Sequence, residues 1–200
     1  MPAVAKEAHS PWKTKAEFQA DFKSARMTAL RTWLAANVGM QTDFIIARSR
    51  AAQAQIADYT QEQVDRLIRG MVWAVAKEST AEMIAQHTVD ETQLGNYDGK
   101  YLKIFRKTRA TLMDIIDDKS VGVIEEDKAR NLIKIAKPVG VIGALSPSTN
   151  PEATPVIKAI SAVKGRNSII IAPHPRAKVT NAMICNLMRD ALVKLGAPAD

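Results

Sequence analysis

The sequence contains little of several residue types on which common protein classes depend. Its 200 residues include one cysteine, three histidines and only 5% aromatic residues. A single cysteine can form neither an internal disulfide nor a cysteine-based zinc site, and we expect no metal site. No apolar run approaches the ~18 residues that a membrane-spanning helix requires, so we expect no membrane partner. The N-terminus lacks the apolar stretch of a secretory signal, which favours a cytoplasmic location.

The amino-acid composition is that of a basic protein of ordinary hydrophobicity. Hydrophobic residues make up 46% of the chain, charged residues 24%, and the formal net charge is +7. This is the profile of a globular protein with enough apolar residues for a core. The charge suits an anionic partner such as a nucleotide, a coenzyme, nucleic acid or a membrane surface, without choosing among them. The sequence ends after a predicted helix, where a further strand is expected, which indicates a fragment.

The first 120 residues are predicted to be helical. Aromatic residues and alanines recur at spacings of three and four over 13–36, with lysines and arginines between them, which predicts an amphipathic basic helix. This helix either packs on the body of the protein or docks on a partner or a protein shell. Two further helices are expected between Thr42 and Thr88, the second starting at a capping box formed by Thr60 and Gln63.

A basic cluster lies on a later predicted helix. Tyr101 and Phe105 fall on the apolar stripe of this helix, where they cannot stack on bases, so we expect no nucleic-acid partner. We interpret the cluster as a solvated helix face. It comprises Lys100, Lys103, Arg106, Lys107 and Arg109.

From about residue 120 the pattern changes to short strands. Residues 121–124 and 132–135 predict a hairpin around a charged segment. Residues 139–145 and 168–172 are apolar and rich in β-branched residues, as in strands covered on both faces. Between the two strands a helix is expected from about Thr154 to Gly165, with Gly165 as its left-handed C-cap. A second helix is expected from about Ala177 to Leu195. Strand and helix therefore alternate, which predicts parallel strands joined by a right-handed crossover.

Each predicted parallel strand is followed by a rigid polar loop. The loops SPSTNP (146–151) and PHPR (173–176) should lie side by side, because the carboxyl ends of parallel strands meet at one edge of the sheet. Their prolines restrict the backbone before binding, and their polar side chains offer hydrogen bonds that suit a nucleotide. The glycines do not form a G-x-G-x-x-G fingerprint and no P-loop occurs. The residues alone therefore leave an ordinary proline-rich connector equally open.

Three motifs in order give a more specific indication. The STNP loop, the KGRN turn and the PHPRA loop within 138–181 resemble the coenzyme-A-acylating branch of the aldehyde dehydrogenase superfamily. DETQLGNYDGK and VGVIEEDK extend the resemblance to about residues 43–200. It implies an α/β fold with a helical N-terminal lead-in, a β-hairpin and the first half of a Rossmann-like parallel sheet. The implied divisions are an N-terminal extension (1–40), a helical part of the cofactor-binding domain (41–120), the hairpin (121–137) and the start of the NAD(P)-binding unit (138–200), with the catalytic domain absent from this chain.

The resemblance also implies a reaction. Enzymes of this branch oxidise a small aldehyde with NAD or NADP as hydride acceptor, through a cysteine thioester that is passed to coenzyme A. This chemistry needs a thiolate, preorganised donors for an oxyanion, and a nicotinamide beside the reacting carbon. NAD and NADP both stay open, and so do acetaldehyde, propionaldehyde, succinate semialdehyde and sulfoacetaldehyde as substrates. The resemblance implies a homo-oligomer when full length, and a cytoplasmic location that in some members is a bacterial microcompartment.

Site residues are assigned by the same resemblance. Asn150 would place its side-chain amide near the oxyanion, although an Asn before Pro151 also commonly caps a turn. The cofactor-binding residues would be Ser146, Pro147, Ser148 and Thr149 in the first loop and His174, Pro175 and Arg176 in the second. His174 stands where ordinary aldehyde dehydrogenases usually carry a lysine that contacts the adenosine ribose. For Arg176 a solvated side chain at the start of a helix is an equal alternative.

The single cysteine is not assigned to catalysis. Cys185 lies at an apolar position of a predicted helix, where a free cysteine usually acts as a small buried hydrophobe. The nucleophile of the family lies in a later domain, so we expect the chain alone to be inactive. The alternative is a truncated, noncatalytic binding or assembly module that docks through the helix at 13–36.

Overall fold

The computed structural model describes residues 25–199, beginning with helix α2 (Ala25–Ile56). The chain divides into two compact units, residues 1–44 and 45–200. The amphipathic helix expected over 13–36 begins outside the described residues, and docking by it stays a prediction. From Ala25 the helix continues through the segment where we expected a separate helix after Thr42, so that expectation is wrong. No proline interrupts this stretch, and a single glycine, Gly39, is too weak a helix breaker to end it.

Three helices follow: α3 (Gln61–Ala76), α4 (Glu78–Thr92) and α5 (Tyr97–Ile115). The capping box predicted at the start of α3 is confirmed. The Gln63 amide donates to Thr60 Oγ1 at 3.3 Å, and the Thr60 amide donates to Gln63 Oε1 at 2.8 Å. Two N–H groups that have no partner within the helix are thereby satisfied.

The break between α3 and α4 was not predicted, because only one helix was expected after Thr60. The backbone of Lys77 is extended, with φ −67° and ψ 145°, so α3 ends there without a glycine or a proline. The Thr80 hydroxyl lies 3.0 Å from the Lys77 carbonyl and within hydrogen-bond distance of two carbonyls of the last turn of α3. The buried Thr80 hydroxyl, which has three backbone carbonyls within reach as acceptors, therefore stabilises a turn that no local sequence signal marks.

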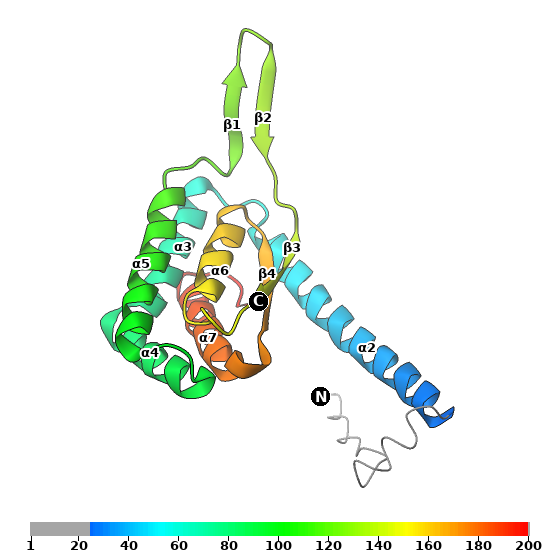
Figure 1. Cartoon of the computed structure of the whole chain (residues 1–200). Coiled ribbons are helices and arrows are strands. Elements are labelled where there is room, and N and C mark those ends of the chain that lie inside the picture. Colours follow the sequence, from blue (N-terminus) through cyan, green and yellow to red (C-terminus); the bar gives the residue numbers. More distant parts are fainter. Residues whose placement is uncertain (1–24, 200) are drawn as a thin grey trace. The chain divides into compact units, whose positions relative to one another are not determined.

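Strands β1 (Gly122–Asp127) and β2 (Leu132–Ala136) form the expected antiparallel hairpin. Val123 pairs with Ile135 and Glu126 with Ile133, so these four side chains lie on one face of the hairpin. The other face carries the ion pair between Lys134 and Glu125, with an N–O distance of 2.6 Å. In Figure 1 the hairpin projects away from the helices.

The rest of the chain is the predicted alternation of strands and helices. β3 (Val141–Ser146), α6 (Thr154–Lys164), β4 (Ser168–Pro173), the short 3₁₀ helix η1 (Pro175–Ala177) and α7 (Lys178–Lys194) follow in order. β3 and β4 pair in parallel, from Val141 opposite Ser168 to Ser146 opposite Pro173. Among residues 25–199 each strand of this pair has one strand neighbour.

Five helices and the parallel strands share one hydrophobic core. α3 packs against α5, α6 and α7, and α6 also packs on both strands of the parallel pair (Figure 1). Apolar side chains at helical spacing supply the contacts, and partly buried apolar side chains pack around the buried ones. The largest are Leu67, Ile68 and Met71 of α3, Ile84 of α4, Ile104 of α5, Ile160 of α6 and Ile184 of α7.

The KGRN turn between α6 and β4 differs from the expectation at its glycine. Gly165 has φ −89°, and Arg166 adopts the left-handed conformation instead, with φ 59°. Asn167 explains the glycine: its Nδ2 would lie 2.8 Å from a Cβ at position 165, so any other residue there would have to displace the Asn167 side chain. The Asn167 side chain donates to the Gly165 carbonyl and accepts from the amides of Val139 and Gly140, which ties the turn to the start of β3. Arg166 is held in its conformation by guanidinium hydrogen bonds to the carbonyls of Ala57 and Ala136.

Helix α7 has its N-terminal cap supplied by another helix. Ala177 occupies the N-cap position and has no side chain that can accept a hydrogen bond. The Glu91 carboxylate of α4 accepts instead from the amides of Val179 and Thr180, each at 2.8 Å, and from the Thr180 hydroxyl at 2.6 Å. A carboxylate at this end also interacts favourably with the helix dipole. Glu91 therefore holds the start of α7, and with it the preceding loop, against α4.

Replacing Glu91 with Gln is expected to lower the free energy of unfolding by about 1–2 kcal/mol at pH 7. Both carboxylate oxygens accept hydrogen bonds, whereas the amide has one oxygen, which accepts more weakly, and an NH₂ group that cannot accept. Burial raises the pKa of Glu91, but the hydrogen bonds from Thr180 and Val179 and the proximity of His87 outweigh it, and the pKa is lowered. This stabilisation is therefore present above the unfolded-state pKa of about 4.3 and is lost as the pH falls through the lower folded-state pKa. Chemical denaturation between pH 3 and 7 measures the difference.

The matched control is Glu82→Gln on the exposed face of the same helix, which should change stability by less than about 0.5 kcal/mol at any of these pH values. A Glu91→Gln deficit that is as large at pH 3 as at pH 7 would contradict the role of the charge.

Candidate functional site

The two polar loops predicted to meet at one sheet edge do lie side by side. Ser146 and Pro173 are the last paired residues of β3 and β4. One step further, the His174 amide donates to the Ser146 carbonyl at 2.9 Å. The pairing of the strands thus continues into the loops, and residues 146–151 and 174–176 form one edge. This arrangement permits both loops to contact the same cofactor.

The Asn150 side chain is not used for the turn before α6. The backbone carbonyl of Asn150 accepts from the amides of Ala153 and Thr154, at 3.4 and 3.1 Å, and so forms the turn by itself. Asn150 Oδ1 accepts from Lys103 Nζ at 2.8 Å, and Asn150 Nδ2 lies 3.3 Å from Thr149 Oγ1. The alternative in which this asparagine merely caps a turn therefore does not describe its side chain.

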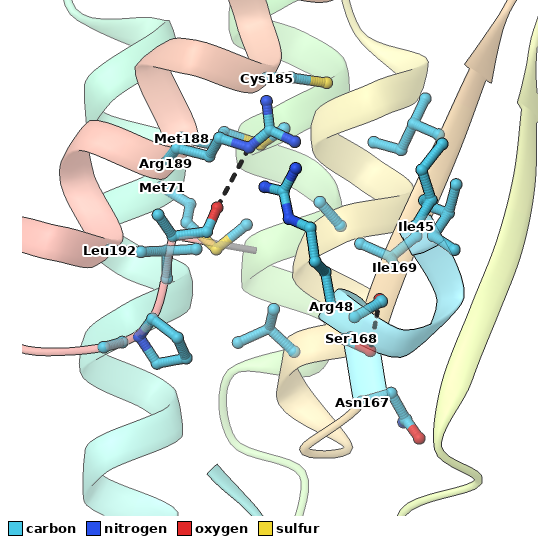
Figure 2. Close-up of a pocket in the computed structure, with 18 of the residues that line it drawn as sticks. Ile45, Arg48, Met71, Asn167, Ser168, Ile169, Cys185, Met188, Arg189 and Leu192 are labelled. Atoms are coloured by element: carbon cyan, nitrogen blue, oxygen red, sulfur yellow. Dashed lines mark hydrogen bonds between the residues drawn. The ribbon is translucent and has the colours of Figure 1, made fainter. Parts of the chain in front are cut away.

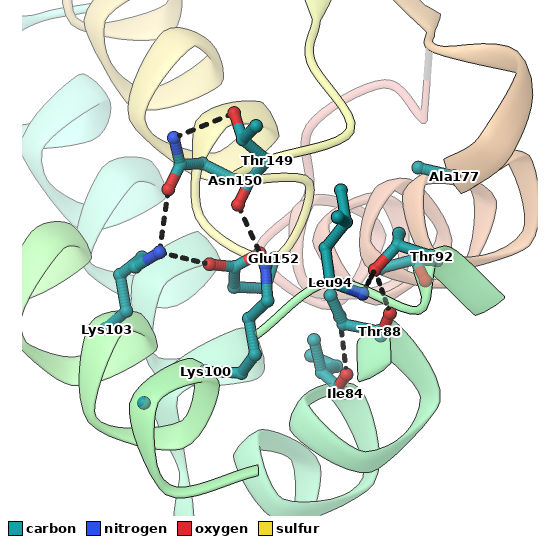
Figure 3. A network of polar contacts seen from close by, with 12 residues as sticks. Ile84, Thr88, Thr92, Leu94, Lys100, Lys103, Thr149, Asn150, Glu152 and Ala177 are labelled. Carbon is teal, nitrogen blue, oxygen red and sulfur yellow. Dashed lines mark hydrogen bonds and ion pairs between the residues drawn. The ribbon is translucent and has the colours of Figure 1, made fainter. Parts of the chain in front are cut away.

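Two lysines of α5 and a buried glutamate hold this loop, as Figure 3 shows. Lys100 Nζ donates to the Thr149 carbonyl at 2.8 Å and to Glu152 Oε2 at 3.2 Å. Lys103 Nζ lies 3.5 Å from Glu152 Oε1. The side chains of Glu152 and Lys100 are 0% and 4% exposed, so neither charge is solvated by water to a useful extent. Removing one partner of such a pair leaves an uncompensated buried charge, which is strongly destabilising.

This arrangement corrects the interpretation of the α5 cluster as a solvated face. Lys100 is buried and Lys103 is only one-third exposed, and both point toward the loop (Figure 3). Arg106, Lys107 and Arg109 are exposed, as expected. Glu152, Lys100 and Lys103 were not assigned to the site from the sequence. The signal that could have found them is a Glu immediately after a rigid Asn-Pro pair, which requires cationic partners once the loop is covered.

The second loop presents a histidine of defined orientation. His174 Nδ1 accepts from the Arg176 amide at 3.1 Å, so the neutral imidazole carries its proton on Nε2. Arg176 is exposed, and its guanidinium donates to the Thr92 carbonyl at the end of α4 at 2.9 Å. The alternative of an entirely solvated Arg176 is therefore not what the structure shows. Pro175 begins η1, where its missing N–H needs no partner.

The first loop retains an unsatisfied group. Ser146 is buried, and its hydroxyl has no hydrogen-bond partner among the described residues. Lys158 of α6 donates to the carbonyl of the preceding strand residue, Leu145, at 2.8 Å. Buried hydroxyls are normally paired, so an unpaired one beside a rigid loop fits a site that offers a hydrogen bond to a ligand.

A mostly apolar cavity lies along β4. It has a volume of about 440 Å³ and is lined by residues of α2, α3, α6, β4 and α7, among them Cys185 of α7 (Figure 2). Of the site residues predicted from the sequence, none lines it. Burial raises the pKa of Cys185, and the nearby Arg189 only partly offsets this, so the thiol form is favoured. This agrees with the assignment of Cys185 as a noncatalytic residue.

Residues 25–199 contain no group of three or more His, Cys, Asp or Glu side chains placed to hold a metal ion. None of the helices in this range has the length and apolarity needed to cross a membrane.

Known proteins similar to this chain are aldehyde dehydrogenases. The family model described as "Aldehyde dehydrogenase family" matches residues 20–200. A sulfoacetaldehyde dehydrogenase of an Acholeplasma species is 44% identical over 155 residues, which is 78% of this chain and 32% of that protein. A succinate-semialdehyde dehydrogenase (acetylating) of Clostridium kluyveri is 44% identical over 154 residues, which is 77% of this chain and 34% of that protein. The chain thus spans about a third of the length of these curated relatives.

Solved structures agree with the sequence relatives. An acetylating aldehyde dehydrogenase from Geobacillus thermoglucosidasius has a TM-score of 0.76 and 34% identity, and the match covers 80% of this chain and 35% of that one. An engineered glycolyl-CoA reductase with bound NADP+ (TM-score 0.65) and a Rhodopseudomonas palustris propionaldehyde dehydrogenase with bound propionyl-CoA (TM-score 0.66) are each 28% identical. Each match covers 78% of this chain, and 35% and 34% of the respective structure. The chain belongs to the aldehyde dehydrogenase family, and the relatives and structures that it resembles include acylating members.

Proposed function

We propose that this chain supplies the nicotinamide-nucleotide-binding part and the oxyanion donor of an enzyme that oxidises a small aldehyde to an acyl-CoA. The observation that carries the proposal is the junction of the two loops, where the β-pairing continues from Ser146 to His174. One rigid edge thereby brings an amide donor, hydroxyls and a cationic loop together. The nucleophilic cysteine is proposed to lie outside residues 1–200, so the chain alone would have no acylating activity.

The loop residues suit a nucleotide by their chemistry. His174 Nε2 and the exposed side of the Arg176 guanidinium offer donors to a ribose hydroxyl or a phosphate, since both groups can only donate there. The Ser146 hydroxyl, Ser148 and Thr149 offer neutral hydrogen bonds along the first loop. NAD or NADP, when bound, supplies the hydride acceptor of the reaction. A related structure holds NADP+, which supports a nicotinamide nucleotide without deciding between the two.

Asn150 is proposed to stabilise the oxyanion formed when a thiolate attacks the aldehyde carbonyl. Its Oδ1 is occupied by Lys103, and one Nδ2 hydrogen is donated to Thr149 Oγ1. The second Nδ2 hydrogen is therefore the part of the amide left for a developing negative charge. The aldehyde is expected to be small; sulfoacetaldehyde and succinate semialdehyde, both anionic, are the substrates named for the two relatives compared above. Coenzyme A is the proposed acyl acceptor, by analogy with the propionyl-CoA in a related structure.

The nucleotide site can be tested on the chain itself by calorimetric titration with NADH and NADPH. His174→Ala is expected to weaken binding by about 3- to 10-fold, because one hydrogen bond contributes about 1 kcal/mol. Arg176→Ala should weaken NADPH binding more than NADH binding if the second loop holds a 2′-phosphate. Lys194→Ala, which removes one exposed positive charge at the other end of α7, is the control and should leave both affinities unchanged. Failure of the unmodified chain to bind either nucleotide would reject the site.

The role of Asn150 can be tested in a chimera in which residues 45–199 replace the matched segment of the Acholeplasma enzyme. Asn150→Asp keeps the shape of the side chain and an oxygen for Lys103, but removes the N–H donors. We expect kcat to fall about 10²- to 10³-fold, the usual effect of losing one oxyanion donor, with KM for the nucleotide nearly unchanged. A variant that keeps kcat and loses nucleotide affinity would place Asn150 in cofactor binding instead.

We also propose that the full-length protein is a homo-oligomer that pairs through the hairpin. Val123, Ile133 and Ile135 share one hairpin face, and each is more than half exposed in the isolated chain. Three large apolar side chains on a projecting two-stranded ribbon are unusual without a partner, since such a ribbon is only marginally stable alone.

The hairpin prediction is that the double substitution Ile133→Lys and Ile135→Lys shifts the protein from oligomer to monomer in light scattering coupled to size-exclusion chromatography. Lys134→Gln on the opposite face is the control and should leave the oligomer intact. An unchanged mass for the double variant would exclude this face as the interface.

A further inference from the structure

The orientation of the Asn150 amide is decided by its neighbours. An amide side chain can be turned by half a rotation, which exchanges its oxygen and its NH₂ group. A lysine ammonium has three donors and no acceptor, so the atom that lies 2.8 Å from Lys103 Nζ must be the oxygen. The reversed orientation would place an NH₂ group against an ammonium and lose a charge-assisted hydrogen bond. Lys103 therefore selects the orientation in which Nδ2 faces away from α5.

Lys103 is itself held in place. Its Nζ lies 3.5 Å from Glu152 Oε1, and Glu152 is the residue two positions after Asn150. The second oxygen of Glu152 accepts from Lys100 at 3.2 Å, and Lys100 also donates to the Thr149 carbonyl at 2.8 Å. One buried carboxylate thus fixes two ammonium groups, and each of these fixes one of two consecutive loop residues (Figure 3).

We propose that Lys103 is a positioning residue for Asn150, kept in register by Glu152 and Lys100, and that it presents the Nδ2 hydrogen not donated to Thr149 as the oxyanion donor. This inference rests on the proposed function for its catalytic consequence, but the positioning itself does not. A cation on the carbonyl oxygen also polarises the amide, which makes its N–H groups better donors. Arg106, Lys107 and Arg109 of the same helix are exposed and take no part.

The positioning can be observed directly by NMR of the ¹⁵N-labelled 200-residue chain. The Asn150 NH₂ resonances are identified as the pair that disappears in Asn150→Ser. In the unmodified chain we expect one pair with an Overhauser contact to the Thr149 side chain, consistent with the 3.3 Å between Nδ2 and Oγ1. In Lys103→Met this pair should shift and lose that contact or split in two, because both amide orientations become populated.

Two matched variants separate positioning from general structural damage. Lys107→Met removes an exposed lysine one turn further along α5 and should leave the Asn150 pair unchanged. Lys103→Arg retains a donor that can reach Oδ1 and should restore a single pair. If Lys103→Met leaves the Asn150 pair at its original position with its contact to Thr149, the proposal is wrong. Widespread shifts across the core in Lys103→Arg as well as Lys103→Met would also overturn it, since that pattern indicates a role in folding alone.

The catalytic consequence is measured in the chimera with the Acholeplasma enzyme. Lys103→Met should lower kcat by about tenfold, the equivalent of one charge-assisted hydrogen bond, leave KM for the nucleotide unchanged, and be largely rescued in Lys103→Arg. A tenfold rise in KM for the nucleotide with unchanged kcat would overturn the catalytic part of the proposal. An unmodified chimera without any aldehyde oxidation would count against the proposed function instead, and the NMR result would still decide whether Lys103 positions Asn150.

Discussion

The parallel pairing of β3 with β4 is the constraint on which the candidate site depends. Because the two strands run in the same direction and in register, both end at the same edge, and the loops that follow them must lie together. The pairing reaches one residue beyond the strands, to the hydrogen bond between the His174 amide and the Ser146 carbonyl. Helix α6 packs on both strands of this pair and belongs to the core that holds them. Every polar group of the site is positioned relative to that edge.

Around this edge the loops are held by charges that come from distant parts of the chain. Lys100 and Lys103 reach the first loop from α5, with Glu152 completely buried between them. Glu91 of α4 caps α7 and so restrains the second loop. Arg176 of that loop donates a hydrogen bond to the Thr92 carbonyl at the end of α4. The helices that precede the sheet therefore also position its loops: α5 holds the first loop, and α4 holds the second. Rigid loops lower the entropic cost of binding a ligand, which suits the roles proposed for both loops.

Much of the fold could be predicted because it follows from local patterns. The capping box at Thr60, the hairpin and the alternation of strands and helices after residue 138 all came from spacing and turn residues. The predictions failed where a distant side chain decides the local conformation. α3 ends at Lys77 without a breaking residue, and Arg166 rather than Gly165 takes the left-handed conformation because its guanidinium is bound to carbonyls more than 25 residues away in sequence. The basic cluster on α5 has the sequence pattern of a solvated helix face, but two of its lysines, Lys100 and Lys103, form ion pairs with Glu152.

The sequence by itself determined the family, the order of the elements and the two loops that carry the candidate site. These depend on residue types at short spacing, such as Asn150 before Pro151 and the KGRN turn, which can be read along the chain. Only the tertiary structure decided which groups are charged partners and which way the amide of Asn150 faces. The physical reason is that Lys103 and Glu152 are 49 positions apart in the sequence, and a buried carboxylate must be neutralised by whichever cation the packing of α5 brings to it.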